Sequence, residues 1–215
     1  MIAQSWSVSN LSFRYNRSAP ELFDGLTHSF EPGVMTGLTG ASGRGKSTLL
    51  YILGQLLRPS TGEVLRGGED LSLLSDGARS RLRAEEIGFV FQDASLDPTG
   101  SVERSVAEPG LYAGKSPAES LPRALELLEK FGLGAEIGKL PSQISGGQAQ
   151  RVAICRALFS SPGLILADEP TGNLDRRNGE LVLEALAAAA AEGRTVVIAT
   201  HDPFVLEHTE RVLEL

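Results

Sequence analysis

A glycine-rich segment at residues 40–48 has the spacing of a phosphate-binding loop. It reads as a glycine, four variable residues, Gly-Lys and a hydroxyl residue, a nucleotide-binding pattern when it joins a strand to a helix. Glycine lets backbone N–H groups turn toward phosphate oxygens, and the N-terminus of the next helix adds positive partial charge. We expect Lys46 to reach the β- and γ-phosphates and the Ser47 hydroxyl to bind Mg²⁺. The predicted phosphate-binding residues are Gly40, Ala41, Ser42, Gly43, Arg44, Gly45, Lys46, Ser47 and Thr48.

Two adjacent acids, Asp168 and Glu169, end an apolar run at residues 164–167. Because neighbouring side chains on an extended strand point to opposite faces, we expect the two acids to have different tasks. Asp168 is suited to hold Mg²⁺ through its water ligands. Glu169 is suited to orient or deprotonate the attacking water as a general base. With the loop upstream, these acids predict hydrolysis of a nucleoside triphosphate.

Residues 144–151, Ile-Ser-Gly-Gly-Gln-Ala-Gln-Arg, resemble the signature sequence of ATP-binding-cassette proteins. Gln92 after Phe91 is similar to the Q-loop of that family, residues 173–175 to its D-loop, and His201 to its switch histidine. The resemblance extends over the whole chain and keeps the family's motif order. It implies that the nucleotide is ATP with Mg²⁺, that Gln92 and His201 join Glu169 and Lys46 in catalysis, and that Gln92 joins Ser47 and Asp168 at the Mg²⁺.

The signature has the features of a second phosphate cradle. Ser145, Gly146 and Gly147 begin a helix predicted over residues 148–159, so they present free N–H groups and a positive helix end to an anion. The resemblance implies that this cradle, with Gln148, closes on the γ-phosphate held by another subunit, and that Asp175 also contributes to nucleotide binding. It implies a head-to-tail, ATP-dependent dimer of identical or closely related subunits.

Tyr15 resembles the family's aromatic residue that stacks on adenine. An aromatic at the end of a strand is also a common core residue, so both interpretations stay open on the sequence alone.

Residues 87–92 and 167–175 are similar to the branch of lipoprotein-release, macrolide-export and cell-division ATPases, which work with a mechanotransmitting membrane subunit. Residues 92–98 are also similar to ATPases of oligopeptide and nickel importers. The resemblance implies a subunit that couples ATP-driven dimer closure to a separate integral membrane permease. The same residues would serve a regulatory module that switches a membrane-bound partner without transport. A soluble cassette ATPase of DNA repair or translation fits less well, since the sequence lacks a basic patch and coiled-coil arms.

Short apolar runs alternate with helical stretches, which predicts a parallel sheet covered by helices. We expect strands at residues 34–38, 87–91, 164–167 and 195–199, with the last three at the sheet centre because they are apolar almost throughout. Helices are predicted at residues 47–57 and across the Ala-rich run 185–191, ending at Gly193. Another is predicted over residues 117–131, with one apolar stripe made of Leu121, Leu125, Leu128 and Phe131. That helix is either a plain surface element or part of a docking surface.

The family resemblance implies one P-loop NTPase domain over residues 1–215. Its expected α/β fold has a mixed, largely parallel sheet flanked by helices, an N-terminal antiparallel β part and a helical insertion subdomain. We place the RecA-like core at residues 1–92 and 144–215 and the insertion at about residues 93–143.

The net charge of −7 and the sequence pI of about 5.1 argue against a nucleic-acid partner, which would need a basic surface. No apolar run approaches the roughly 18–20 residues that span a bilayer, and the first ten residues lack the pattern of a signal peptide. We therefore expect a cytoplasmic protein, and the family resemblance implies that it is peripheral on the cytoplasmic face of the cell membrane. The single cysteine, Cys155, is expected to be a small core residue and not a nucleophile.

Overall fold

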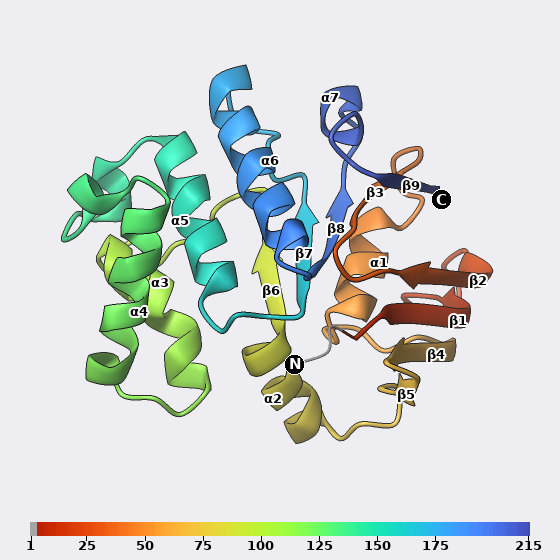
Figure 1. The fold of residues 1–215 in the computed structure, drawn as a ribbon. Coiled ribbons are helices and arrows are strands. Elements are labelled where there is room, and N and C mark those ends of the chain that lie inside the picture. The colour runs from red at the N-terminus through yellow and green to blue at the C-terminus, as the bar shows by residue number, and fades with distance from the viewer. Residues whose placement is uncertain (1–3) are drawn as a thin grey trace.

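The chain folds around a five-stranded parallel sheet with the order β6-β7-β8-β3-β9. The computed structural model describes residues 4–215. The strands of this sheet are β3 (Met35–Thr39), β6 (Ile87–Val90), β7 (Leu164–Asp168), β8 (Thr195–Ala199) and β9 (Arg211–Glu214). The strands run parallel, so their carboxyl ends share one edge of the sheet (Figure 1). The phosphate loop follows β3, and the two acids lie at the end of β7. The sheet therefore brings together motifs that are far apart in the sequence.

The prediction that residues 87–91 form a central strand is wrong, because β6 lies at one end of this strand order. Its apolar character has another cause. Helices α2 (Asp76–Glu86) and α5 (Gly146–Leu158) both pack against β6, so Ile87 and Val90 are buried without a second neighbouring strand. Strands β7 and β8 do lie inside the sheet, as predicted, and every residue of β8 is buried.

A second sheet is antiparallel and has the order β2-β1-β4-β5. Its strands are β1 (Trp6–Phe13), β2 (Leu22–Phe30), β4 (Thr61–Arg66) and β5 (Glu69–Asp70). Helix α1 (Lys46–Leu53) shares one apolar core with both sheets; that core includes Trp6, Phe30, Leu49, Ile52 and Leu166. This packing fixes the helix at whose N-terminus the phosphate loop ends.

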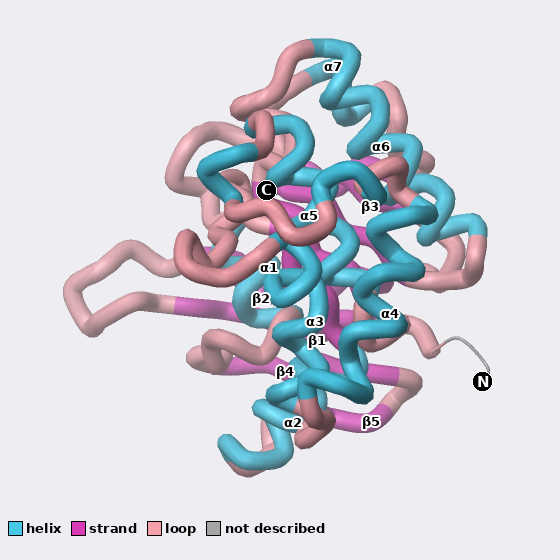
Figure 2. The backbone as a smooth tube through the Cα atoms, turned by 90° about the vertical axis from the view of Figure 1, so that its left-hand side faces the viewer, coloured by secondary structure: helices cyan, strands magenta, loops and turns pink. Residues whose placement is uncertain are grey.

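The other face of the parallel sheet is covered by α5 and α6 (Arg176–Ala191), and α3 (Val102–Tyr112) and α4 (Pro117–Lys130) lie beyond α5 (Figures 1 and 2). These helices share a second core with the sheet, which includes Val106, Leu128, Ile154 and Leu186. Two 3-10 turns, η1 (Gly134–Glu136) and η2 (Pro141–Gln143), lead into α5, and α7 (Pro203–Leu206) precedes β9. Helices α3 and α4 fall inside the range predicted for the insertion, whose subdomain boundaries stay a prediction.

The helix predicted over residues 117–131 is present as α4, but its buried stripe differs from the predicted one. Leu121 is exposed, and the buried residues are Ser120, Ala124, Leu127 and Leu128. The reason is that α4 packs against both α3 and α5, so its buried face is set by these two neighbours. The Ala-rich run is helical as predicted and belongs to α6. The helix ends before Gly193, whose φ is 93°.

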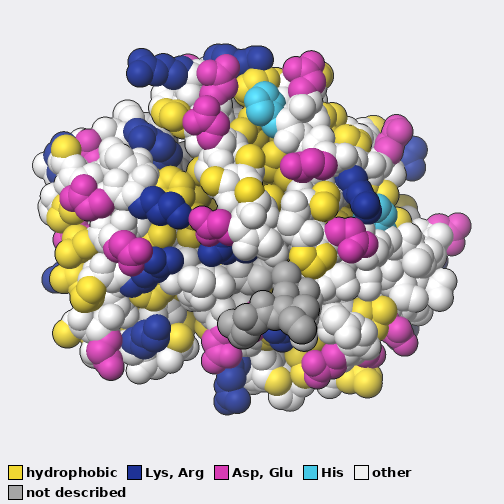
Figure 3. All heavy atoms as spheres, viewed as in Figure 1, with side chains coloured by type: hydrophobic (Ala, Val, Ile, Leu, Met, Phe, Trp, Pro, Cys, Tyr) yellow, Lys and Arg dark blue, Asp and Glu magenta, His cyan; other side chains and the backbone are white. Residues whose placement is uncertain are grey.

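None of the helices within residues 4–215 is long and apolar enough to cross a membrane. On the face shown in Figure 3, acidic and basic side chains are interspersed over the helices. Cys155 is fully buried in α5, and burial raises the pKa of its thiol to about 12. A thiol in this state is protonated and inert at neutral pH, which confirms the prediction of a core residue.

Candidate functional site

The glycine-rich loop connects β3 to α1. Its shape depends on two positions where only glycine fits without strain. Gly40 and Gly45 have φ angles of 138° and 98°, in the region that side chains with a Cβ avoid. A Cβ at Gly45 would lie 2.7 Å from the Phe23 ring, and one at Gly40 would lie 2.6 Å from the Leu215 carbonyl oxygen. Lys46 donates from Nζ to the Gly40 carbonyl at 2.7 Å, so its ammonium group lies over the loop.

The loop forms one wall of a cavity of about 760 Å³. Strand ends, α1 and residues one or two positions after a strand supply the other walls. The lining residues are Tyr15, Leu22, Gly40, Ala41, Ser42, Gly43, Gly45, Lys46, Ser47, Thr48, Gln92, Asp168, Glu169 and His201. Thus the fold gathers most of the residues that the sequence predicted for nucleotide, Mg²⁺ and catalysis. Arg44, Ser145, Gly146, Gly147, Gln148 and Asp175 do not line this cavity.

Ser47 and Asp168 form the polar floor of the cavity. The Ser47 hydroxyl donates to Asp168 Oδ1 at 3.0 Å across a sequence separation of 121 residues. Burial raises the pKa of the Asp168 carboxyl, while the Ser47 hydrogen bond opposes this shift and the neighbouring Glu169 adds to it. A carboxylate that is costly to ionise here would be stabilised by a cation.

Glu169 takes its own place in the cavity because its φ of 44° turns it out of strand geometry. The two acids therefore face the same cavity. Simple strand alternation would have placed them on opposite faces of the sheet. Their partners nevertheless differ. Glu169 Oε2 accepts from the Thr200 hydroxyl at 3.0 Å, and Oε1 lies 2.6 Å from Nδ1 of His201.

Tyr15 is a surface residue and not part of the core. Its side chain is 62% exposed, and its hydroxyl lies 2.7 Å from the Thr48 hydroxyl. An edge-on contact with Phe13, with ring centroids 4.8 Å apart, supports it from one side. An exposed aromatic face beside the phosphate loop is available for stacking.

The signature residues lie at the N-terminus of α5, away from the cavity. Ser145 caps the helix: its side chain accepts from the Gln148 backbone N–H, and the side-chain Oε1 of Gln148 accepts from the Ser145 backbone N–H at 2.7 Å. Gln148 in turn donates at 2.7 Å to Glu136, a buried carboxylate that also pairs with Lys139. A Cβ on Gly146 would meet nothing within 4 Å. The prediction that the Ser145 N–H is free is wrong, because this group donates to the Gln148 side chain. The N–H groups of Gly146 and Gly147 lie at the helix N-terminus, which is exposed at Gly146, and the phosphate cradle there stays a prediction.

Residues 173–175 join the signature region to the segment after β6. Asp175 caps α6 by accepting from the Asn178 N–H at 2.9 Å, which lowers the pKa of the Asp175 carboxyl. Asn173 donates at 3.0 Å to Asp93, next to Gln92. Asn178 also lies where a Cβ on Gly147 would project, at 2.5 Å.

The residues of the cavity fit ATP and Mg²⁺ by their chemistry. The loop offers backbone N–H groups and Lys46 for phosphates, and the hydrogen-bonded Ser47–Asp168 pair offers one hydroxyl and one carboxylate. Mg²⁺ keeps several waters and usually needs only one or two protein ligands beside phosphate oxygens. No cluster of three or more His, Cys, Asp or Glu suitable for a metal occurs in residues 4–215.

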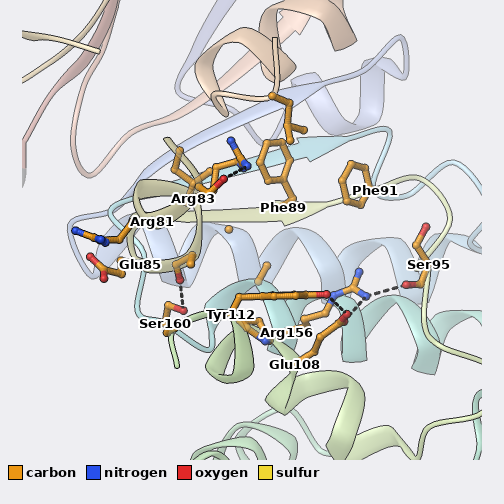
Figure 4. Close-up of a pocket in the computed structure, with 18 of the residues that line it drawn as sticks. Arg81, Arg83, Glu85, Phe89, Phe91, Ser95, Glu108, Tyr112, Arg156 and Ser160 are labelled. Carbon is orange, nitrogen blue, oxygen red and sulfur yellow. Dashed lines mark hydrogen bonds and ion pairs between the residues drawn. The ribbon is translucent and has the colours of Figure 1, made fainter. Parts of the chain in front are cut away.

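A larger groove of about 810 Å³ lies between α2, β6, α3 and α5 (Figure 4). Its lining combines aromatic residues, among them Phe89, Phe91 and Tyr112, with Arg156 and Glu108. The sequence left open whether the helical insertion is a plain surface element or part of a docking surface, and it did not locate this groove or show that β6 and α5 contribute to it.

Several residues of the site were missed at the sequence level. Tyr51, whose hydroxyl is 3.5 Å from Asp168 Oδ2, lies four residues after Ser47 on the same helix, a spacing that could have indicated a shared face. Thr200 directly precedes His201 and could have been included with it. For Glu136 and Arg156 no local pattern pointed to a role, since their contacts depend on tertiary packing.

The glycine-rich loop between a strand and a helix, with a strand-end acid bonded to its serine, defines a P-loop nucleotide-binding domain. A family model described as ABC transporter matches residues 23–172. The chain belongs to the ABC transporter family, in the class of its ATPase domains.

Two curated relatives are exporters by name. The chain is 45% identical over 203 residues to the macrolide export ATP-binding/permease protein MacB of Wolinella succinogenes, covering 94% of this chain and 32% of that protein. It is 44% identical to the pyoverdine export ATP-binding/permease protein PvdT of Pseudomonas entomophila, covering 91% of this chain and 30% of the relative. The chain thus spans about a third of the length of these relatives.

Among solved structures, the chain resembles a dimeric post-hydrolysis state of the ATP-binding cassette MJ0796 bound to ADP and Pi. The TM-score is 0.87 at 35% identity, and the match covers 98% of this chain and 94% of that chain. A second dimeric structure of MJ0796, described as a bacterial ABC transporter cassette, matches with the same values. The fold class predicted from the sequence is confirmed.

Proposed function

We propose that this chain binds and hydrolyses ATP with Mg²⁺ and that this cycle drives a membrane permease. The observation that supports this most strongly is the single cavity that gathers the phosphate loop, the Ser47–Asp168 pair and the Glu169–His201 pair. In this proposal Lys46 and residues 40–48 bind the phosphates, while Ser47, Asp168 and Gln92 would hold Mg²⁺, which would neutralise phosphate charge. Glu169 accepts the proton of the attacking water, and His201 and Thr200 orient the Glu169 carboxylate. Tyr15 stacks on the adenine.

The proposed working unit is a head-to-tail dimer of two copies or of close homologues. Ser145, Gly146, Gly147 and Gln148 are separate from the cavity of their own chain and open to solvent at Gly146, which suits a phosphate presented by a second subunit. Asp175, beside this cradle, lies at the same contact in the proposal. The similarity to dimeric MJ0796 cassettes supports this arrangement.

The proposed membrane partner is a permease, encoded separately or within a longer chain, with the ATPase on the cytoplasmic face. The relatives named as export ATP-binding/permease proteins favour transport over a purely regulatory switch. We propose that the permease docks in the groove of Figure 4, since an apolar floor with charged walls suits a protein segment. The transported compound is proposed only as an exported substance.

The test of the proposed chemistry is Glu169→Gln, which keeps the shape and removes the basicity. Hydrolysis should fall by roughly 10² to 10⁴, the scale of a lost general base, while ATP affinity by calorimetry stays within about twofold. Glu184→Gln is the matched control, because Glu184 is an exposed residue of α6 that does not line the cavity. A Glu169→Gln variant that turned over ATP near the wild-type rate would remove Glu169 from the proposed role.

A further inference from the structure

Residues 91–95, here called the Gln92 segment, separate the nucleotide cavity from the groove of Figure 4. Gln92 lines the cavity, whereas Phe91 and Ser95 line the groove. The segment follows directly after β6 and has no regular secondary structure of its own. A shift in its backbone therefore changes both sites at once.

Side chains from two distant parts of the chain hold the Gln92 segment. Gln150 of α5 donates to the Phe91 carbonyl at 2.9 Å, and Asn173 donates to the Asp93 side chain at 3.0 Å. Arg156 of α5 makes two more bonds, to the carbonyls of Ala94 and Ser95, each at 2.8 Å. Arg156 thus contributes more of these bonds than either of the other two side chains.

The Ser95 backbone shows why this anchoring matters. Its φ of 48° lies in the left-handed region, where a residue with a side chain is uncommon. The Ser95 hydroxyl donates to the Asp93 carbonyl at 3.0 Å, and its own carbonyl is held by Arg156. The turn that aims Gln92 at the cavity therefore depends on the guanidinium group.

The same guanidinium group also faces the groove. Its side chain is only 12% exposed, and Nη1 lies 3.8 Å from Glu108 of α3. Glu108 accepts from the Tyr112 hydroxyl at 2.8 Å. Figure 4 shows Arg156 between Glu108 on one side and Ser95 on the other. A segment that enters the groove and engages Glu108 or Tyr112 changes the charge and the space around Arg156.

We propose that Arg156 is a positioning residue for the nucleotide site, which sets Gln92 by holding the Ala94 and Ser95 carbonyls and responds to what binds beside Glu108. The proposal rests on the proposed function, because only ATP hydrolysis gives the position of Gln92 a consequence. Arg156 touches neither nucleotide nor metal in this account. Its effect passes entirely through the Gln92 segment.

The test is a double-mutant cycle of Arg156→Met with Gln92→Ala, measured as kcat and KM for ATP. In the wild-type background Arg156→Met should lower kcat by roughly 10- to 100-fold, the scale of a misplaced catalytic group, with KM within about twofold. In the Gln92→Ala background Arg156→Met should lower kcat by less than a further factor of about two, since the side chain that Arg156 positions is absent. Hydrogen exchange should quicken at residues 92–95 and stay unchanged at residues 41–48.

The control is Arg58→Met, because Arg58 likewise donates to two backbone carbonyls, those of Ser72 and Leu74, far from the Gln92 segment. It should leave kcat and KM unchanged. Arg156→Lys keeps the charge but has a single donor atom, so its kcat should lie between those of Arg156→Met and wild type. It also serves if the methionine variant does not fold.

Two results would overturn the proposal while leaving ATP hydrolysis in place. One is a wild-type kcat in a folded Arg156→Met or Arg156→Lys variant. The other is an equal loss in both backgrounds of the cycle, which would indicate a general structural role. Absence of ATPase activity in the wild-type protein would instead overturn the proposed function, and this inference with it.

Discussion

At the scale of single residues, the nucleotide site is built around charges that are unfavourable without a ligand. Burial raises the pKa of the Asp168 carboxyl, and Glu169 adds to that shift. The folded protein thus holds a proton on Asp168 more tightly than the unfolded chain does. Stability from this group is present below the ordinary pKa of aspartate and is lost as pH rises through the folded pKa. Once ionised, the Asp168 side chain destabilises the nucleotide-free protein.

Asp168→Asn should therefore raise the Tm of the protein at pH 7 in the absence of nucleotide and Mg²⁺. A rise of a few degrees is expected, because about 1 kcal/mol corresponds to roughly 2–4 °C for a chain of this size. The difference should shrink as the pH approaches 4, where aspartate in the unfolded chain also becomes protonated. Scanning calorimetry across this pH range is the measurement.

Asp76→Asn provides a control of opposite sign. A hydrogen bond from Arg58 lowers the pKa of the Asp76 carboxyl, so any stability from this group is present above the ordinary aspartate pKa and lost at lower pH. This exposed variant should be no more stable than wild type at pH 7. If Asp168→Asn were less stable than wild type at pH 7, the inference that ionised Asp168 destabilises the nucleotide-free protein would be wrong.

At the scale of elements, helix α5 has two tasks at its two ends. Its N-terminus carries the proposed signature cradle, and its later turns hold the Gln92 segment through Gln150 and Arg156. The cradle itself is supported from behind by Glu136, which fixes the Gln148 amide that in turn accepts from the Ser145 N–H. Loss of this support should weaken phosphate binding at the proposed cradle and leave the phosphate loop unchanged.

Glu136→Ala should weaken ATP-dependent dimerisation by roughly 5- to 30-fold, because a lost helix cap is worth about 1 kcal/mol and a symmetric dimer would contain two cradles. Dimerisation is best measured by sedimentation in the Glu169→Gln background, where hydrolysis does not deplete ATP. Nucleotide affinity of the monomer should stay unchanged.

Glu136→Gln should restore most of the dimer, since its carbonyl can still accept from Gln148. Glu126→Ala removes a glutamate that only pairs with Arg123 on the exposed side of α4 and is the matched control. If Glu136→Ala dimerised as strongly as the Glu169→Gln protein that carries no other change, Glu136 would have no part in the cradle.

Most elements that carry motifs could be predicted from the sequence, because their signals are local. The phosphate loop, the strand before Asp168 and the helix after Ser145 each depend on residues within one short stretch. What could not be predicted depends on packing between elements. Residues 87–91 look like a central strand but form an edge strand covered by α2 and α5, and Leu121 is exposed because α4 faces two neighbours at once.

The site shows the same division. The residue types at Lys46, Asp168 and Glu169 predicted nucleotide chemistry, but the φ of 44° that brings Glu169 beside Asp168 is not encoded in a local pattern. Arg156 contacts backbone carbonyls more than sixty residues away in the sequence, a contact that requires α5 to pack on β6. Sequence motifs therefore indicated the chemistry, and the tertiary structure supplied the positioning groups.

At the scale of the whole molecule, the two proposed phosphate-binding surfaces of one chain lie apart. The cavity holds the phosphate loop, and the signature cradle lies outside it. A complete site then needs two subunits. The structure also guides the choice of a lesion for the cradle: a side chain at Gly147 would collide with Asn178 of its own chain, whereas Gly146 has nothing within 4 Å. Gly146→Asp should therefore fold normally and block only an incoming phosphate.

The central claim, that each ATP site is shared between two subunits, is tested most directly by mixing Lys46→Ala with Gly146→Asp protein. Each variant alone should be inactive. In a mixed dimer one site carries both lesions and the other carries none, so the mixture should recover about a quarter of wild-type hydrolysis if subunits pair at random and sites act independently. Because coupling between sites can suppress turnover, ATP-dependent dimerisation of the mixture is recorded together with hydrolysis. A mixture that neither dimerises with ATP nor hydrolyses it, under conditions where wild type does both, would contradict the shared site.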